Sequence, residues 1–97
     1  WVLKNEGRFD KVAEAVSDKS GIVMEVYTDL PGMQFYTANF LDNEPGKEGA
    51  SYMRRSAVCF ETQYYPDSVH HENFPQPVCR KGEKYATRTA YRFLTRE

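Results

Sequence analysis

Short runs of β-branched and aromatic residues, separated by turn-forming residues, constrain this chain more than any other feature of its sequence. No long stretch has the apolar spacing of a helix, whereas several runs have the length and composition of strands. The pattern therefore predicts an all-β chain with antiparallel strands. The predicted strands are Val12–Val16, Ile22–Thr28, Met33–Phe40, Ala57–Tyr64 and Tyr85–Phe93.

The first two predicted strands are expected to form a hairpin. The segment Lys11–Val16 alternates in polarity, and the polar stretch Ser17–Gly21 that follows it ends in glycine, as hairpin turns commonly do. A helix over Phe9–Ser17 is the competing interpretation, because the apolar residues of this segment also fit one helical face. The short length of the run favours the hairpin.

Turn residues divide the rest of the chain. In Leu30–Gly32, proline fixes one dihedral and glycine tolerates a left-handed one, so we expect the second and third strands to form another hairpin-like pair. The charged segment Asp42–Ser51, with its proline and glycines, predicts an exposed loop. Asp67–Gly82 predicts a long irregular connection, of the kind that is usually functional or wraps a surface. Glu83–Leu94 then alternates as a half-exposed terminal strand does.

Composition excludes several classes of function. Thirteen Lys and Arg against 14 Asp and Glu give a net charge of −1, so there is no basic footprint for nucleic acid. No apolar run approaches the about 20 residues of a membrane-spanning helix, and we expect a soluble chain. The chain begins with Trp1 rather than Met, and Trp1–Lys4 resembles the middle of a strand, so we expect it to be cut from a longer protein.

The cysteines and histidines give little support for a metal or a disulfide. Cys59 and Cys79 are expected to be buried free thiols. The acidic and histidine residues around His70 and His71 lack any ligand spacing typical of zinc, so no metal is expected. The glycines of Gly46–Gly49 lack the rest of a phosphate-binding loop, and the chain contains no serine nucleophile elbow.

Glu61 is the first candidate for chemistry, because it lies within an otherwise apolar predicted strand, on the same face as Cys59 and Gln63. A carboxylate there costs free energy unless it is paired, and loss of water favours its neutral form, which would make Glu61 a poised acid or base. Two structural alternatives stay open. Glu61 could form an ion pair with Arg54, Arg55 or an arginine of the last strand, or simply face solvent on an edge strand.

Gln34 is the second candidate, because an amide both donates and accepts hydrogen bonds, as a sugar hydroxyl does. Alone it is weak evidence, since polar residues are normal on the wet face of an antiparallel strand. Its aromatic neighbours Phe35, Tyr36 and Phe40 could be core residues or a stacking platform, and spacing does not separate the two.

Three blocks of the sequence resemble, in order and spacing, the C-terminal third of the aldose 1-epimerase family. They are GIVMEVYTDLPGMQFYTANFLD from Gly21, SAVCFETQYYPDS from Ser56 and NFPQPVCRKGEKYATRTAYRF from Asn73. The match is specific, because E-T-Q precedes P-D-S and N-F-P and follows P-G-x-Q-F-Y-T. The departures are modest: Ala38 stands where the family usually has glycine, and His70-His71 occupies usually Pro-rich positions.

The resemblance implies a large antiparallel β-sandwich, of which residues 1–97 are the C-terminal portion of a single domain whose N-terminal portion is absent. It implies an enzyme that interconverts the α and β anomers of hexoses such as galactose and glucose. Glu61 matches the catalytic base, which takes the C1 hydroxyl proton, and Gln34 matches a sugar contact. The histidine that protonates the ring oxygen is implied to lie upstream of Trp1. The resemblance implies no metal or organic cofactor.

Further expectations follow from the resemblance. The implied partner is a free hexose, with no nucleic acid and no membrane. The open sheet edges are expected to pair with the missing N-terminal part or with another copy of the chain. Residues 1–97 alone are expected to be a poor enzyme, because the base lacks its acid.

Location and exact function stay partly open at this point. A cytoplasmic location is expected, with a periplasmic or secreted one not excluded. The alternatives in function are a non-catalytic sugar-binding β-sandwich and a relative that acts on a phosphorylated hexose. The latter would need arginines to converge on the site, and Arg54 or Arg55 are the residues in question.

Overall fold

The computed structural model describes residues 1–96, which form strands and two short 3-10 turns with no α-helix among them. The prediction of an all-β antiparallel chain is confirmed. The strands are β1 (Asp10–Val16), β2 (Ile22–Thr28), β3 (Gly32–Tyr36), β4 (Glu44–Pro45), β5 (Ser51–Tyr52), β6 (Cys59–Gln63) and β7 (Thr89–Thr95), and the 3-10 turns are η1 (Lys47–Gly49) and η2 (Ser68–His70). No helix in this part of the chain is long and apolar enough to cross a membrane.

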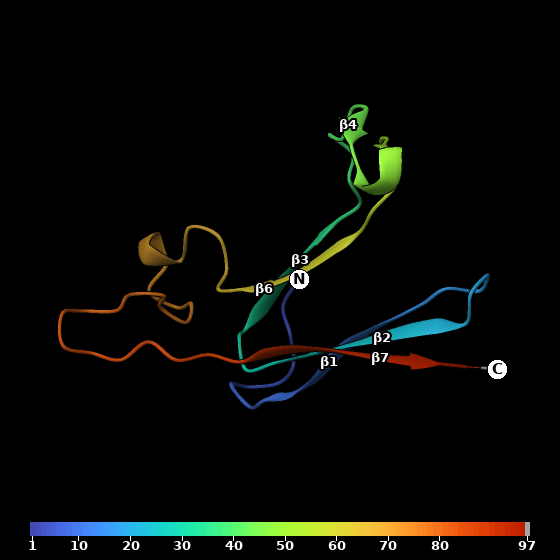
Figure 1. Cartoon of the computed structure of the whole chain (residues 1–97). Helices are drawn as coiled ribbons and strands as arrows, with labels where there is room; N and C mark the ends of the chain where they lie inside the picture. Colours follow the sequence, from blue (N-terminus) through green and yellow to red (C-terminus); the bar gives the residue numbers. More distant parts are fainter. Residues whose placement is uncertain (97) are drawn as a thin grey trace.

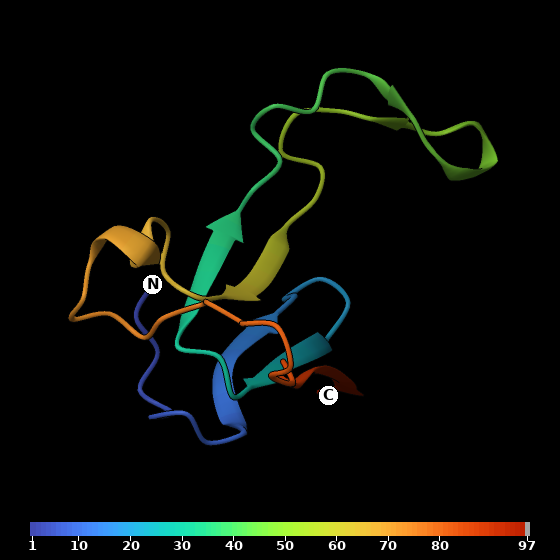
Figure 2. The same cartoon turned by 90° about the vertical axis from the view of Figure 1, so that its left-hand side faces the viewer.

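Three antiparallel sheets make up the fold (Figure 1). A three-stranded sheet has the order β1-β2-β7, a two-stranded ribbon pairs β3 with β6, and β4 pairs with β5 in an arm that projects away from the other two (Figure 2). The chain is therefore a pair of small layers that meet where β6 approaches β7, with one hairpin standing apart.

The hairpin expected from residues 11–28 is confirmed, and the competing helix over Phe9–Ser17 is not present. Gly21 closes the turn with a φ of +70°, which an L side chain rarely adopts. Its amide donates to the Ser17 carbonyl oxygen at 2.8 Å, and the Ser17 amide donates to the Ile22 carbonyl oxygen at 2.9 Å. Local turn chemistry and alternation were sufficient to predict this element.

The expected pairing of the second and third strands is wrong. Both edges of β2 are occupied, by β1 and β7, so the turn Leu30–Gly32 carries the chain to a different sheet, where β3 pairs with β6. Gly32 does not adopt a positive φ. It is required by close approach instead, since an added Cβ would lie 2.9 Å from Cδ1 of the Tyr65 ring.

Three predicted strands are longer than the strands observed, and the one predicted over 57–64 is present only as β6, Cys59–Gln63. The run 33–40 ends as a strand at Tyr36, because Ala38 adopts a φ of +58° and its carbonyl oxygen accepts hydrogen bonds from the Leu41 and Arg55 amides. The predicted strand from Tyr85 begins only at Thr89, which lies opposite Thr28 at the end of β2. In the part of the chain that the structure describes, residues 85–88 have no strand beside them with which to pair.

The two irregular segments differ in content. The predicted loop Asp42–Ser51 is exposed, as expected, but it contains β4, η1 and the start of β5. The connection Asp67–Gly82 has only the short turn η2.

The expectation of buried thiols is wrong, since Cys59 and Cys79 are free and exposed. Cys59 lies at the start of β6, and Cys79 lies in the irregular connection.

The first residues lie beside β3, as a strand-like reading of Trp1–Lys4 suggests. Val2 forms a β-bridge with Gly32, and the Leu3 amide donates to the Pro31 carbonyl oxygen at 3.0 Å. Buried Asn5 then fixes this segment to the end of β2, because the two hydrogens of its side-chain nitrogen are shared among three main-chain carbonyl oxygens, those of Arg8, Thr28 and Leu30. The apolar core of the described residues is small: Val23, Val26, Leu30, Met33 and Ala38.

Candidate functional site

Gln34 and Glu61, the two residues that the sequence singles out, lie directly opposite one another in the β3–β6 ladder. Side chains of directly opposed residues in an antiparallel pair project from the same face, with Cβ atoms about 4.5–5.5 Å apart. Both residues are exposed. The fold therefore brings one amide and one carboxylate side by side, although β3 and β6 are separated by the whole β4–β5 arm.

The alternation of the ladder assigns the two faces of the ribbon. The face of Glu61 also carries the Tyr36–Cys59 pair and Gln63, whose partner is Gly32, as the sequence pattern for Cys59 and Gln63 predicts. The opposite face carries Thr62, whose hydroxyl contacts the Thr89 hydroxyl of β7 at 2.6 Å. The Thr62 side chain is thus turned toward β7, and Gln34 and Glu61 project from the other face of the ribbon. We call the latter the outer face.

Aromatic side chains flank the polar pair along the outer face. At one end, Tyr36 stacks on Phe40 with ring centroids 6.4 Å apart, and its hydroxyl oxygen accepts a hydrogen bond from the Phe40 amide. At the other end, the ring of Tyr65 occupies the space above Gly32. Phe35 points the other way and packs on Phe60 on the opposite face. The structure therefore places Tyr36 on the outer face and Phe35 on the opposite face, a distinction that the sequence spacing did not make.

The expectation that Glu61 is desolvated within a buried strand is wrong for the described chain. Glu61 is exposed, because β6 pairs with β3 alone and no described residue forms a layer over the outer face. Within residues 1–96 it also forms no ion pair. Arg55, one of the arginines considered as its partner, donates instead to Asn39 at 3.1 Å. Of the structural alternatives, solvent exposure on an edge strand is the one observed.

Two hollows lie near the ribbon, on different sides of it. A shallow one of about 370 Å³ borders Glu61 where β6 approaches β7. A larger one of about 600 Å³ lies between the N-terminal segment, β1 and the face of Phe35 and Phe60. The larger hollow lies on the side of the ribbon opposite Gln34 and Glu61, so we do not assign it to the site. The smaller one is lined by Met24, Val58, Cys59, Phe60, Glu61, Tyr91 and Phe93.

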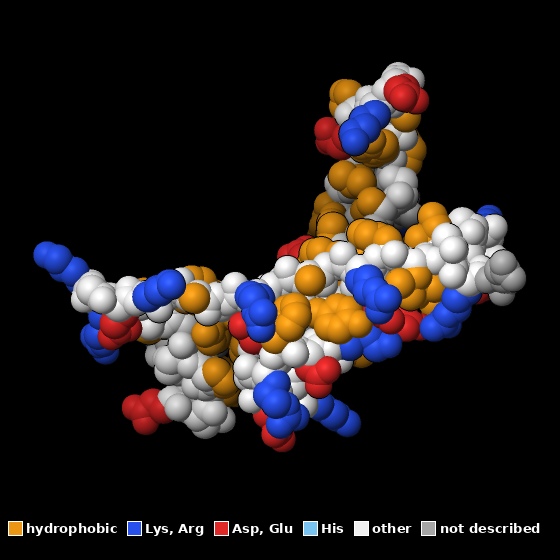
Figure 3. Space-filling view, turned by 60° about the horizontal axis from the view of Figure 1, so that its bottom comes forward, with side chains coloured by type: hydrophobic (Ala, Val, Ile, Leu, Met, Phe, Trp, Pro, Cys, Tyr) orange, Lys and Arg blue, Asp and Glu red, His pale blue; other side chains and the backbone are white. Residues whose placement is uncertain are grey.

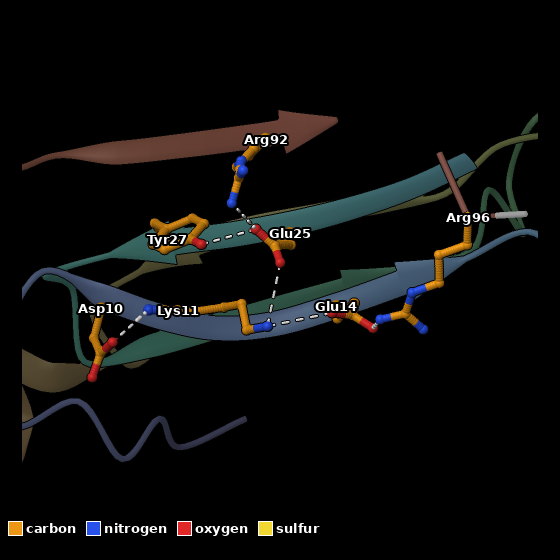
Figure 4. A network of polar contacts seen from close by, with 7 residues as sticks. All are labelled: Asp10, Lys11, Glu14, Glu25, Tyr27, Arg92 and Arg96. Atoms are coloured by element: carbon orange, nitrogen blue, oxygen red, sulfur yellow. Dashed lines mark hydrogen bonds and ion pairs between the residues drawn. The ribbon is translucent and has the colours of Figure 1, made fainter. Parts of the chain in front are cut away.

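A cluster of charged groups lies elsewhere, on the face of the three-stranded sheet that points away from the ribbon (Figure 4). A hydrogen bond of 2.8 Å from the Tyr27 hydroxyl, helped by Lys11 and Arg92, lowers the pKa of the Glu25 carboxyl. The carboxylates of Glu14 and Glu25 raise the pKa of the Lys11 ammonium. Each Glu25 oxygen already has a partner, so this cluster ties the three strands together and leaves no group free for chemistry.

The two histidines of the long connection, His70 and His71, both contact the nearby Asp67. The carboxylate of Asp67 contacts Nδ1 of His70 and, at 3.3 Å, Nε2 of His71. His71 also packs against the ring of Phe74. In the part of the chain that the structure describes, no group of three or more His, Cys, Asp or Glu side chains is arranged to hold a metal ion.

Comparison with known proteins finds one matching family and several similar relatives. Residues 1–92 match the family described as aldose 1-epimerase. The chain is 51% identical to galactose mutarotase of Mus musculus and of Homo sapiens over 75 residues, 76% of this chain and 22% of each relative. It is 36% identical to aldose 1-epimerase of Escherichia coli over 97% of this chain and 28% of that relative. The chain thus spans about a quarter of the length of these relatives.

Proposed function

The chain belongs to the aldose 1-epimerase family, and from this premise we propose that the whole protein interconverts the α and β anomers of free hexoses such as galactose and glucose. In this proposal Glu61 is the general base and Gln34 holds the sugar. The observation that carries it is the register of β3 and β6, which sets the Gln34 amide directly opposite the Glu61 carboxylate on one open face.

The proposed reaction uses Glu61 to move one proton. A carboxylate oxygen of Glu61 accepts the proton of the C1 hydroxyl while the ring oxygen receives a proton from an acid, so the bond from C1 to the ring oxygen breaks and C1 becomes an aldehyde carbon. Rotation about the C1–C2 bond presents the other face of the carbonyl. The former ring oxygen, now a hydroxyl, then adds to C1 and returns its proton to the conjugate base of the acid, while Glu61 returns its proton to the carbonyl oxygen, and the opposite anomer leaves.

Gln34 has the chemistry to orient the sugar for that transfer. Its amide donates through nitrogen and accepts through oxygen, which suits a hydroxyl that does both. Because the two side chains stand about 4.5–5.5 Å apart at Cβ, they can contact neighbouring groups of one sugar. The stacked rings of Tyr36 and Phe40 add a flat apolar surface beside them.

A non-catalytic sugar-binding protein is the second candidate, and the exposure of Glu61 is the observation that favours it. A relative acting on a hexose phosphate has less support, because the Arg55 side chain already donates to Asn39. Polarimetry on freshly dissolved α-D-galactose and α-D-glucose tests these against one another. We expect the whole protein to accelerate mutarotation of both sugars. Binding without acceleration would support the sugar-binding candidate, and activity on hexose 6-phosphates alone would support the third.

Gln34→Ala separates binding from chemistry in the same assay. Loss of one neutral hydrogen bond is expected to raise KM about 3- to 10-fold, with a smaller effect on kcat. A kcat that falls while KM stays constant would show that Gln34 acts in the chemical step rather than in binding.

A further inference from the structure

Two side chains of β7 reach the residues on either side of Glu61. The Tyr91 hydroxyl donates to the carbonyl oxygen of Phe60 at 2.5 Å, and the Thr89 hydroxyl contacts the Thr62 hydroxyl at 2.6 Å. Phe60 and Thr62 are the immediate neighbours of Glu61 in β6. The strand that carries the proposed base is therefore linked to the three-stranded sheet both just before and just after that base.

The Thr62 contact continues into the buried part of the sheet. The Thr28 hydroxyl donates to the Arg88 carbonyl oxygen at 3.1 Å, and it lies 3.1 Å from the Thr89 hydroxyl. Each hydroxyl has one hydrogen, so Thr89 must donate to Thr28, and Thr62 must donate to Thr89. Thr28 is fully buried. A directional chain of three hydroxyls thus anchors β6, through β7, to β2.

These links matter because little else fixes β6 in place. Within residues 1–96, β6 pairs only with β3, and an isolated two-stranded ribbon is marginally stable in water. Apolar packing at this junction is incomplete, since a hollow of about 370 Å³ separates Glu61 from Tyr91 and Phe93, and the Phe93 side chain is 66% exposed. Within the described residues, these two links are the hydrogen bonds that join β6 to the three-stranded sheet.

We propose that Thr89 and Tyr91 are positioning residues, which hold β6 so that the Glu61 carboxylate meets the sugar at a fixed distance and angle. The inference rests on the proposed function of Glu61. A general base must come within about 2.6–3.2 Å of the proton it removes. A displacement of about 1 Å can cost about 100-fold in rate. Neither residue touches the sugar in this account, and both act through the backbone of β6.

The test compares Thr89→Val and Tyr91→Phe with matched controls in the whole protein. Thr95→Val makes the same change on the same strand, and Tyr85→Phe removes an exposed hydroxyl; within residues 1–96 neither control side chain forms a hydrogen bond. Each test variant is expected to lower kcat about 3- to 10-fold with KM changed less than about 2-fold. Thr89→Ser, which keeps the hydroxyl, should restore kcat. An unchanged kcat in both test variants, or an equal fall in the controls, would overturn the proposal.

Hydrogen exchange of the β6 backbone amides gives a readout that needs no activity. Both test variants are expected to speed exchange in β6 about 10-fold while leaving β1 and β2 unchanged. If the wild-type protein is active and β6 exchange does not change, the positioning role is wrong while the proposed function stands. If the wild-type protein shows no mutarotation, the proposed function is wrong and the positioning role for catalysis fails with it.

Discussion

Cys59 offers a chemical probe of the outer face at the scale of one residue. Its exposed thiol lies two residues before Glu61 on the same face and opposite Tyr36. Alkylation with N-ethylmaleimide would place a bulky group beside the Gln34–Glu61 pair, so we expect it to block sugar binding. Cys59→Ser should stay active and resist the reagent, as followed by polarimetry before and after treatment.

Cys79 supplies the control for that experiment, because its thiol is also free and exposed but lies in the irregular connection. Cys79→Ser should remain as sensitive to the reagent as the wild type. If Cys79→Ser gives protection and Cys59→Ser does not, the outer face is not where the sugar binds.

At the scale of elements, the β1–β2 hairpin depends on glycine in a way that can be measured. Gly21 and Gly49 both have positive φ, +70° and +76°, so alanine at either adopts a strained backbone that costs about 1–2 kcal/mol. At Gly21 the new Cβ would also lie 2.5 Å from the carbonyl oxygen of Arg96, whereas nothing lies within 4 Å at Gly49. Gly21→Ala should therefore cost about 1–3 kcal/mol more than Gly49→Ala in urea unfolding. Equal costs would mean that the Arg96 contact gives way freely.

The charged cluster of the three-stranded sheet predicts a pH dependence of stability. The pKa of Glu25 lies below its ordinary value of about 4.3, so its stabilising effect is present above that pH and is lost as pH falls through the lowered pKa. We expect Glu25→Gln to lower Tm at pH 7 and to lose its difference from the wild type in acid. Glu6→Gln, at an exposed position in the N-terminal segment, is the control. It should change neither the Tm at pH 7 nor the dependence of Tm on pH. A Glu25→Gln difference that persists in strong acid would contradict the assigned cause.

The same cluster acts in the opposite sense at alkaline pH. The pKa of Lys11 lies above its ordinary value of about 10.4, so its contribution is complete below that pH and is lost as pH rises through the raised pKa.

Elements were predictable from the sequence where their determinants are local. The alternation of 11–16 and the glycine-ended turn after it specify a hairpin without reference to the rest of the chain. The pairing of β3 with β6 is not local, and nothing in Leu30–Gly32 indicates that β2 already has two partners. The end of β3 was missed because the apolar run continues past Ala38, where the backbone turns to positive φ.

For the candidate site too, the features set by local alternation were predictable and those set by the fold were not. Alternation placed Glu61, Cys59 and Gln63 on one face, and their register confirms it. The exposure of Glu61 could not be read from apolar neighbours, because burial depends on which layer covers a strand. The roles inferred for Thr89 and Tyr91 could not be predicted from the sequence either. Alternation assigns them to one face of β7, but only the fold shows that this face meets β6.

At the scale of the whole molecule, open sheet edges and exposed apolar side chains dominate. Within the described residues, β1 and β7 each have one unpaired edge in the three-stranded sheet. Apolar side chains are exposed among the charged ones over the body and along the arm (Figure 3), and the Trp1 and Phe40 side chains are 80% and 89% exposed. Surfaces of this kind favour pairing with another polypeptide segment, either of the same protein or of a second copy.

We therefore expect the 97-residue chain, prepared alone, to associate with itself or with a separately supplied remainder of the protein. Light scattering coupled to size-exclusion chromatography over a range of concentrations would detect this. A chain that stays monomeric at high concentration, with its edge amides protected from hydrogen exchange, would contradict the expectation.

The most direct measurement of the central claim is mutarotation by Glu61→Gln in the whole protein, followed by polarimetry on fresh α-D-galactose. Glutamine keeps the shape of the side chain but its amide cannot take up the C1 proton, and general base catalysis is typically worth about 100- to 10,000-fold. The account predicts a loss of kcat in that range while sugar binding, measured by calorimetry, stays within about 3-fold of the wild type. A Glu61→Gln protein that turns over sugar at a rate near that of the wild type would contradict it, and Glu61 would then be a surface carboxylate without a catalytic role.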